Sequence, residues 1–169
     1  MPRARALVLI ALAAAALAPA GGVRAQTPAA IAVPDGAAVL TLHAEGAQIY
    51  ECKPAADGKT AWAFREPVAT LILDGKTVGR HYAGPHWEHI DGSAVTGKVA
   101  ASAPGATAND IAWLKLDVVG HRGSGVLAPV TAVQRINTSG GVVAGACEHP
   151  GALRPVPYSA DYVFLRTGG

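Results

Sequence analysis

Short apolar stretches of strand length, separated by turn residues, repeat along the chain from about residue 36 onward. In residues 48–52, apolar and polar side chains alternate with the period of two that is typical of a strand. Dipeptides such as Asp74-Gly75 and Asp91-Gly92 are typical of tight turns. The stretches expected to form strands are 39–43, 48–52, 61–65, 68–73, 77–82, 86–90, 94–100, 111–119, 130–137 and 158–166.

About ten short strands with frequent turns predict an all-β fold, either an antiparallel β-sandwich or a β-barrel. The length of 169 residues suits one domain, which we expect to span residues 36–169. Residues 26–35 are rich in Ala and Pro and are expected to form a flexible lead-in. Residues 101–110 and 139–157 are expected to be irregular loops.

Residues 1–25 have the layout of a secretory signal peptide. Arg3 and Arg5 precede a run of 12 apolar residues at 7–18, shorter than the roughly 20 that a membrane span needs. Two candidate cleavage motifs follow, Ala18-Pro19-Ala20 and Val23-Arg24-Ala25. The sequence therefore predicts an exported protein, periplasmic or secreted, with no membrane insertion after cleavage. A buried N-terminal helix is the alternative interpretation.

Cleavage after Ala25 changes the charge of the chain. It removes three of the 14 basic residues and leaves 11 against 12 acidic residues. A nearly neutral chain without basic runs has no stripe that could follow a phosphate backbone, so nucleic acid is not an expected partner. The oligomeric state cannot be predicted from these features.

The mature chain contains two cysteines, Cys52 and Cys147, which are 95 positions apart. In an oxidising compartment, an isolated pair is most simply a disulfide. A redox pair or a metal–thiolate site is the alternative, but the sequence has no Cys-x-x-Cys motif and no histidine beside Cys52. We therefore predict a structural disulfide.

Several motifs together give the chain a family resemblance. They are GAQIYEC at 46–52, GRHYAGPHWE at 79–88, DGS at 91–93, IAWL at 111–114, RINTSGG at 135–141, Cys147 and VPYSADY at 156–162. Over residues 33–165, the chain resembles the domain-of-unknown-function 3455 family of exported bacterial and fungal proteins. The resemblance implies one secreted domain with paired cysteines and supplies no activity. It also implies Thr at the position of His86, so a metal role for His86 would be peculiar to this chain.

Residues 81–93 hold the densest group of side chains that could bind a ligand or a metal: His81, Tyr82, His86, Trp87, Glu88, His89, Asp91 and Ser93. On a strand, His86 shares a face with Glu88, whereas His89 shares the opposite face with Asp91. A zinc or copper ion at His86 and His89 therefore needs a further ligand, such as His43, His121 or His149. We favour the alternative, exposed histidines beside a core Trp87.

A hydrolytic site is also conceivable in this segment, with Ser93 or Ser124 as the nucleophile and His81 or His121 as its base. However, Arg122 stands where a nucleophile elbow needs glycine. Glu88 and Asp91 could form carboxylate pairs with other acids in space, which sequence distance cannot test. A metal-dependent or hydrolytic secreted enzyme that uses residues 81–93 thus stays the alternative function.

A non-enzymatic binding module is the favoured function, with a small molecule, a glycan or a surface component as its ligand. Aromatic side chains form suitable walls for such ligands, here Tyr50, Tyr82, Trp87, Tyr158 and Tyr162. Arg135 lies in an apolar run, and if it faces inward it needs a carboxylate or carbonyl partner. The candidate ligand-binding residues are Tyr50, His81, Tyr82, Trp87, Glu88, Asp91, Arg135 and Tyr158.

Overall fold

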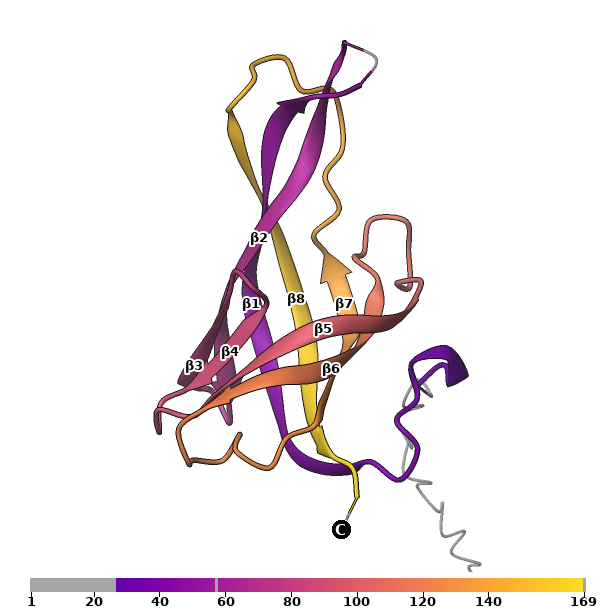
Figure 1. Cartoon of the computed structure of the whole chain (residues 1–169). Coiled ribbons are helices and arrows are strands. Elements are labelled where there is room, and N and C mark those ends of the chain that lie inside the picture. Colours follow the sequence, from indigo (N-terminus) through magenta and orange to yellow (C-terminus); the bar gives the residue numbers. More distant parts are fainter. Residues whose placement is uncertain (1–26, 57, 169) are drawn as a thin grey trace, which may run out of the picture.

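The computed structural model describes residues 27–56 and 58–168. Within this part of the chain, eight antiparallel strands form one sheet that closes into a barrel (Figure 1). Each strand pairs with the next in sequence, and β8 pairs with β1. The strands are β1 (Ala37–Pro54), β2 (Thr60–Leu73), β3 (Lys76–Tyr82), β4 (His86–His89), β5 (Ala94–Ala103), β6 (Trp113–Arg122), β7 (Ala132–Gly140) and β8 (Leu153–Arg166). The all-β prediction is confirmed, in its barrel form.

The strand count falls below ten because two pairs of predicted strands are continuous. β1 runs straight through Gly46, where a Cβ atom would lie only 2.0 Å from the carbonyl oxygen of Val68. Gly46 therefore permits a close approach of β1 to β2 and does not form a turn. β2 runs through Pro67 because β2 pairs with β3 only from Ala69 onward. At Pro67 one edge of β2 has no neighbouring strand, so the missing N–H leaves no gap in a ladder.

The two predicted loops are shorter than expected. β5 continues to Ala103, β7 to Gly140, and β8 begins at Leu153. Strand pairing overrides the Gly and Pro content of these stretches: β8 pairs with β1 as far as Leu153, where it lies opposite Glu51. The irregular segment between β7 and β8 is therefore confined to residues 141–152.

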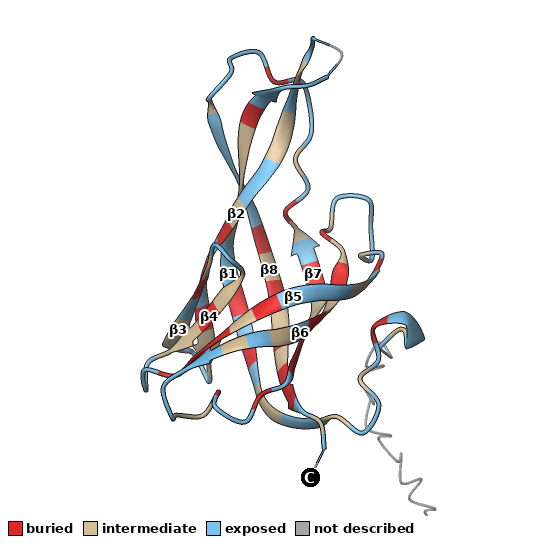
Figure 2. Ribbon diagram, in the orientation of Figure 1, coloured by how far each residue is buried: buried red, intermediate tan, exposed pale blue. Residues whose placement is uncertain are grey.

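The barrel interior holds the main hydrophobic core. Along β1 and β8 every second side chain points inward, and Figure 2 shows the resulting alternation of buried and exposed residues. The largest fully buried side chains include Trp87, Tyr162, Phe164, Leu42 and Leu71. No helix among the described residues has the length and apolar character required to cross a bilayer.

A smaller core lies on the outside of the barrel. The short 3-10 helix η1 (Ala29–Ile31) packs Ile31 against Trp113 of β6 and Ala103 of β5. The side-chain amide of Gln134 donates a hydrogen bond of 2.7 Å to the Ile31 carbonyl. Part of the segment that was expected to be a lead-in thus packs against the barrel wall.

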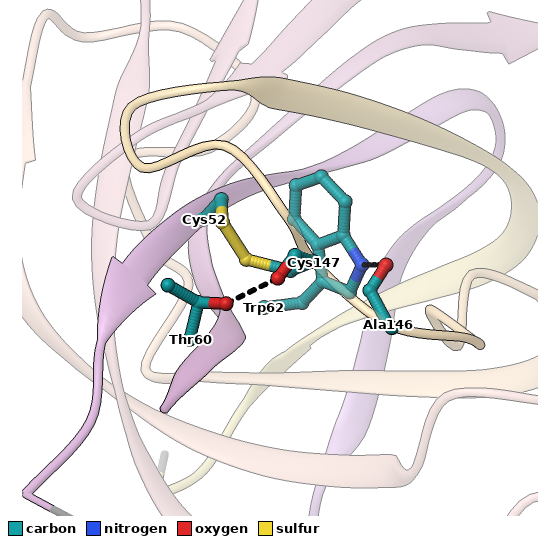
Figure 3. Close-up of a disulfide and its surroundings, with 5 residues drawn as sticks. All are labelled: Cys52, Thr60, Trp62, Ala146 and Cys147. Carbon is teal, nitrogen blue, oxygen red and sulfur yellow. Dashed lines mark hydrogen bonds between the residues drawn. A yellow bond between two sulfur atoms is a disulfide. The ribbon is translucent and has the colours of Figure 1, made fainter. Parts of the chain in front are cut away.

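An arm extends beyond the barrel (Figure 1); it consists of residues 50–64 from β1 and β2, the loop 141–152, and the start of β8. The predicted disulfide between Cys52 and Cys147 lies in this arm, with a Cα–Cα distance of 5.7 Å. Beside it, the Thr60 hydroxyl donates to the carbonyl of Cys147 (Figure 3). The indole N–H of Trp62 donates to the Ala146 carbonyl at 3.2 Å. The disulfide and these bonds attach the loop to β1 and β2.

Candidate functional site

A cavity of about 190 Å³ lies where β1 and β2 leave the barrel for the arm. Each of the eight described strands contributes at least one side chain to its wall. The apolar part of the wall includes Phe64, Trp87, Val99, Leu114 and Leu116. The polar part includes Gln48, His81, Arg135 and Tyr162. An apolar hollow with a few convergent polar groups is the usual composition of a small-molecule site.

His81 points inward from β3 and is buried beside Trp87, with 4.5 Å between the centres of the two stacked rings. Its Nδ1 atom lies 2.8 Å from the carbonyl oxygen of His86. Because a carbonyl only accepts hydrogen bonds, Nδ1 carries the proton and Nε2 of the neutral ring is an acceptor. Burial lowers the pKa of His81 to about 3, so the ring is neutral at physiological pH.

The low pKa of His81 predicts a loss of stability in acid. An unfolded histidine has a pKa of about 6.5, so below that pH the unfolded chain binds a proton that the folded chain does not. We therefore expect the His81 contribution to be fully present above about pH 7. Between pH 6.5 and about 3, the free energy of unfolding should fall by up to about 1.4 kcal/mol per pH unit. Urea unfolding at pH 7, 6 and 5 measures the slope, which should be shallower in His81→Gln. Equal slopes in the two proteins would contradict this assignment.

Arg135 reaches the cavity from β7. Its Nε and Nη2 atoms both donate to the carbonyl oxygen of Ala112, at 3.0 and 2.8 Å. Among the described residues, no carboxylate forms an ion pair with this guanidinium. Burial raises the pKa of Tyr158 and of Tyr162, and the positive charge of Arg135 opposes both shifts. The carbonyl partner that an inward-facing Arg135 requires is therefore present, and the cavity carries a positive charge.

Gln48 is a polar residue on the inward face of β1 and is only 3% exposed. Its Nε2 atom is buried and has no hydrogen-bond partner among the described residues. Leaving such a donor unpaired costs about 1–3 kcal/mol, so unpaired donors of this kind are rare in folded proteins. Gln48 therefore places in the cavity wall an amide N–H that makes no hydrogen bond of ordinary geometry with the described residues, although the amide acts on the nearby Tyr158 hydroxyl.

Three of the predicted residues lie on the outer face of the barrel, away from the cavity. Glu88 accepts hydrogen bonds from Arg122 at 2.7 Å, from Arg80 at 3.1 Å and from the Tyr82 hydroxyl at 3.0 Å. The Arg122, Tyr82 and Arg80 donors hold the pKa of Glu88 below its ordinary value. The ring of Tyr82 stacks on His86, with 5.2 Å between centres. Tyr82, His86 and Glu88 thus belong to a surface network and do not join the cavity.

Asp91 organises the turn after β4. Its Oδ1 accepts bonds from the hydroxyl and the backbone N–H of Ser93 at 2.6 and 2.9 Å, and its Oδ2 accepts from the Val126 N–H at 2.7 Å. The Ser93 hydroxyl, the Val126 N–H and the Ser93 N–H hold the pKa of Asp91 well below its usual range. Ser93 is fully buried, and its hydroxyl donates a hydrogen bond to Asp91 rather than to a histidine. These hydrogen bonds connect the turn at residues 91–93 to the loop that contains Val126. They do not place Ser93 as a nucleophile.

The histidines considered as metal ligands do not converge. His86 and His89 lie at the two ends of β4 and on opposite faces. His86 Nδ1 lies 2.6 Å from the carbonyl oxygen of Ala83, and His89 Nδ1 lies 3.1 Å from Asp91 Oδ2. Within residues 27–56 and 58–168, no three His, Cys, Asp or Glu side chains are grouped so that they could hold a metal. We therefore do not place a zinc or copper site here.

The structure brings together His81, Trp87 and Arg135 from the predicted set. Tyr158 is buried but does not line the cavity, and its hydroxyl is 3.3 Å from that of Tyr162. Tyr50 lies at the base of the arm and donates to the Gly141 carbonyl at 2.8 Å. The sequence reasoning missed Gln48, Leu114 and Leu116. The sequence could have indicated Gln48, because it lies on the same face of its strand as the apolar residues Leu42 and Ala44 and is therefore expected to point inward.

Comparison with known proteins gives one result. A family model described as "Protein of unknown function (DUF3455)" matches residues 34–166, which include all eight described strands and the arm. No match was found among curated proteins or among solved structures. The barrel, its disulfide and its cavity therefore all lie within the matched region. The chain belongs to the DUF3455 family of proteins of unknown function.

Proposed function

We propose that this chain is a non-enzymatic binding protein that holds a small, largely apolar ligand in the cavity of its barrel. The observation that carries the proposal is the cavity of about 190 Å³, with its mainly apolar wall. An eight-stranded barrel is either filled by its own side chains or leaves room for one small ligand. A cavity of about 150 Å³ accommodates benzene. The volume here thus suits one ring with a small substituent.

The cavity also has an apolar entrance. Phe64 and Val99 line it and are 54% and 53% exposed. Exposed apolar side chains that adjoin a hollow are typical of ligand-binding surfaces. They would lose their contact with water when an apolar ligand enters, which favours binding.

We place this binding outside the cytoplasm. The Cys52–Cys147 disulfide is consistent with a periplasmic or extracellular location, where such bonds persist. The secretory pattern of residues 1–25 agrees with that location, although these residues lie outside the described part of the chain.

Toluene is a suitable probe, since it is neutral, apolar and of the right size. We expect isothermal titration calorimetry to show saturable binding of one toluene per wild-type chain. Leu114→Trp, which places a large side chain in the cavity wall, should weaken binding at least tenfold. Val119→Trp is the matched control, because Val119 lies exposed on the same strand. No saturable binding to folded wild-type protein, or equal binding by the two variants, would contradict the proposal.

A further inference from the structure

Arg135 and Gln48 supply the cavity wall with hydrogen-bond donors. A guanidinium has five N–H donors. The Ala112 carbonyl occupies two of the Arg135 donors, one on Nε and one on Nη2. The guanidinium also interacts with the Tyr162 hydroxyl. Its remaining hydrogens lie on Nη1 and Nη2, the pair that can bind both oxygens of a carboxylate. Gln48 Nε2 adds another buried donor without a partner in the described chain.

The described side chains that line the cavity carry positive charge and no negative charge. The described lining contains two arginines, Arg65 and Arg135, and no Asp or Glu. Arg65 is partly exposed and forms an ion pair with Glu66 at 3.1 Å. Arg135 therefore holds the uncompensated positive charge of the interior, since His81 is neutral. Arg135 is only half-buried, but its charge has no counterion among the described residues, and an anionic ligand would supply one.

Gln48 and Arg135 line the same cavity. Trp87, Leu114 and Leu116 supply apolar surface in the same cavity. One end of a bound molecule would thus meet donors, and the rest would meet hydrocarbon and an aromatic ring.

We propose that the ligand is a small monocarboxylate with an apolar body about the size of a benzene ring. Its carboxylate is bound by Arg135 and Gln48, and its body packs against Trp87, Leu114 and Leu116. The inference rests on the proposed function and specifies its ligand class. A single guanidinium compensates a single negative charge, so a monoanion fits this site better than a doubly charged phosphate ester.

Benzoate and nitrobenzene test the inference, because they share shape and both carry two oxygens, but only benzoate is charged at pH 7. We expect calorimetry to show that wild-type protein binds benzoate at least about tenfold more tightly than nitrobenzene. Arg135→Met lacks both the charge and the paired donors, so it should lose the preference for benzoate over nitrobenzene. Arg135→Lys keeps the charge without the paired donors, so its preference should fall between the two.

The outcomes separate this inference from the proposed function. Equal affinity of wild-type protein for benzoate and nitrobenzene would overturn the carboxylate assignment, even where toluene binds. An undiminished benzoate preference in Arg135→Met would overturn the role of Arg135. If Arg135→Met does not fold, the Arg135→Lys variant is used instead. A preference for benzoate over nitrobenzene as strong in Arg135→Lys as in wild type would then overturn the role of Arg135. Failure of toluene to bind the folded wild-type protein would overturn the proposed function itself.

Discussion

Replacing Trp87 with alanine is expected to lower the free energy of unfolding by about 3–5 kcal/mol. The ring is 1% exposed and lies at the centre of the aromatic core. Its centre is 4.5 Å from that of His81, 5.3 Å from that of Tyr162 and 6.3 Å from that of Phe164. Truncation removes these contacts and leaves a void beside the existing cavity. Denaturant unfolding at pH 7 measures the loss.

Trp62→Ala provides a matched control for this experiment. Trp62 lies in the arm, where it donates to the Ala146 carbonyl at 3.2 Å and lies 5.8 Å from the Arg154 guanidinium. One hydrogen bond and one cation–π contact predict a loss of about 1–2 kcal/mol. Should Trp87→Ala cost no more than Trp62→Ala, Trp87 would not have the central packing role assigned to it.

The second large effect is expected from the double variant Cys52→Ala, Cys147→Ala. The disulfide joins residues 95 positions apart, and its loss should lower the free energy of unfolding by about 2–5 kcal/mol. Without it, the unfolded chain gains the conformational freedom that the closed loop denies it. Urea unfolding of the variant, beside oxidised wild-type protein, measures the difference.

Reduced wild-type protein is the control for the two substitutions. It should unfold at nearly the same urea concentration as the double variant, because both lack the cross-link. The disulfide lies in the arm and does not line the cavity, so the folded double variant should still bind toluene. An unchanged unfolding midpoint in both samples would show that the disulfide adds little to stability.

The predicted strands were largely correct because apolar alternation and turn dipeptides are local signals. The errors arose where local signals have a second meaning. The expected gaps between residues 43 and 48 and between residues 65 and 68 are absent, because Gly46 permits a close approach to Val68 and Pro67 lies on a stretch of β2 that β3 does not reach. Both explanations depend on the neighbouring strands, which the local pattern does not reveal.

The candidate site was only partly predictable, for a related reason. His81, Trp87 and Arg135 attracted attention as unusual residues in an apolar chain, and all three line the cavity. Leu114 and Leu116 resemble any other core leucines, and their place at the cavity follows from the register of the closed barrel. Residues next to one another in sequence, such as His81 and Tyr82, face opposite sides of the sheet.

Binding in the cavity can be observed most directly by NMR of ¹⁵N-labelled protein titrated with toluene. The side-chain amide of Gln48 and the indole N–H of Trp87 are both buried, belong to residues that line the cavity and have no described partner. We expect both signals to shift and then saturate as toluene is added. The indole of Trp113 is an internal control, because it is buried in the small outer core instead. Unchanged Gln48 and Trp87 signals in the folded protein, or shifts confined to Trp113, would contradict binding in the barrel.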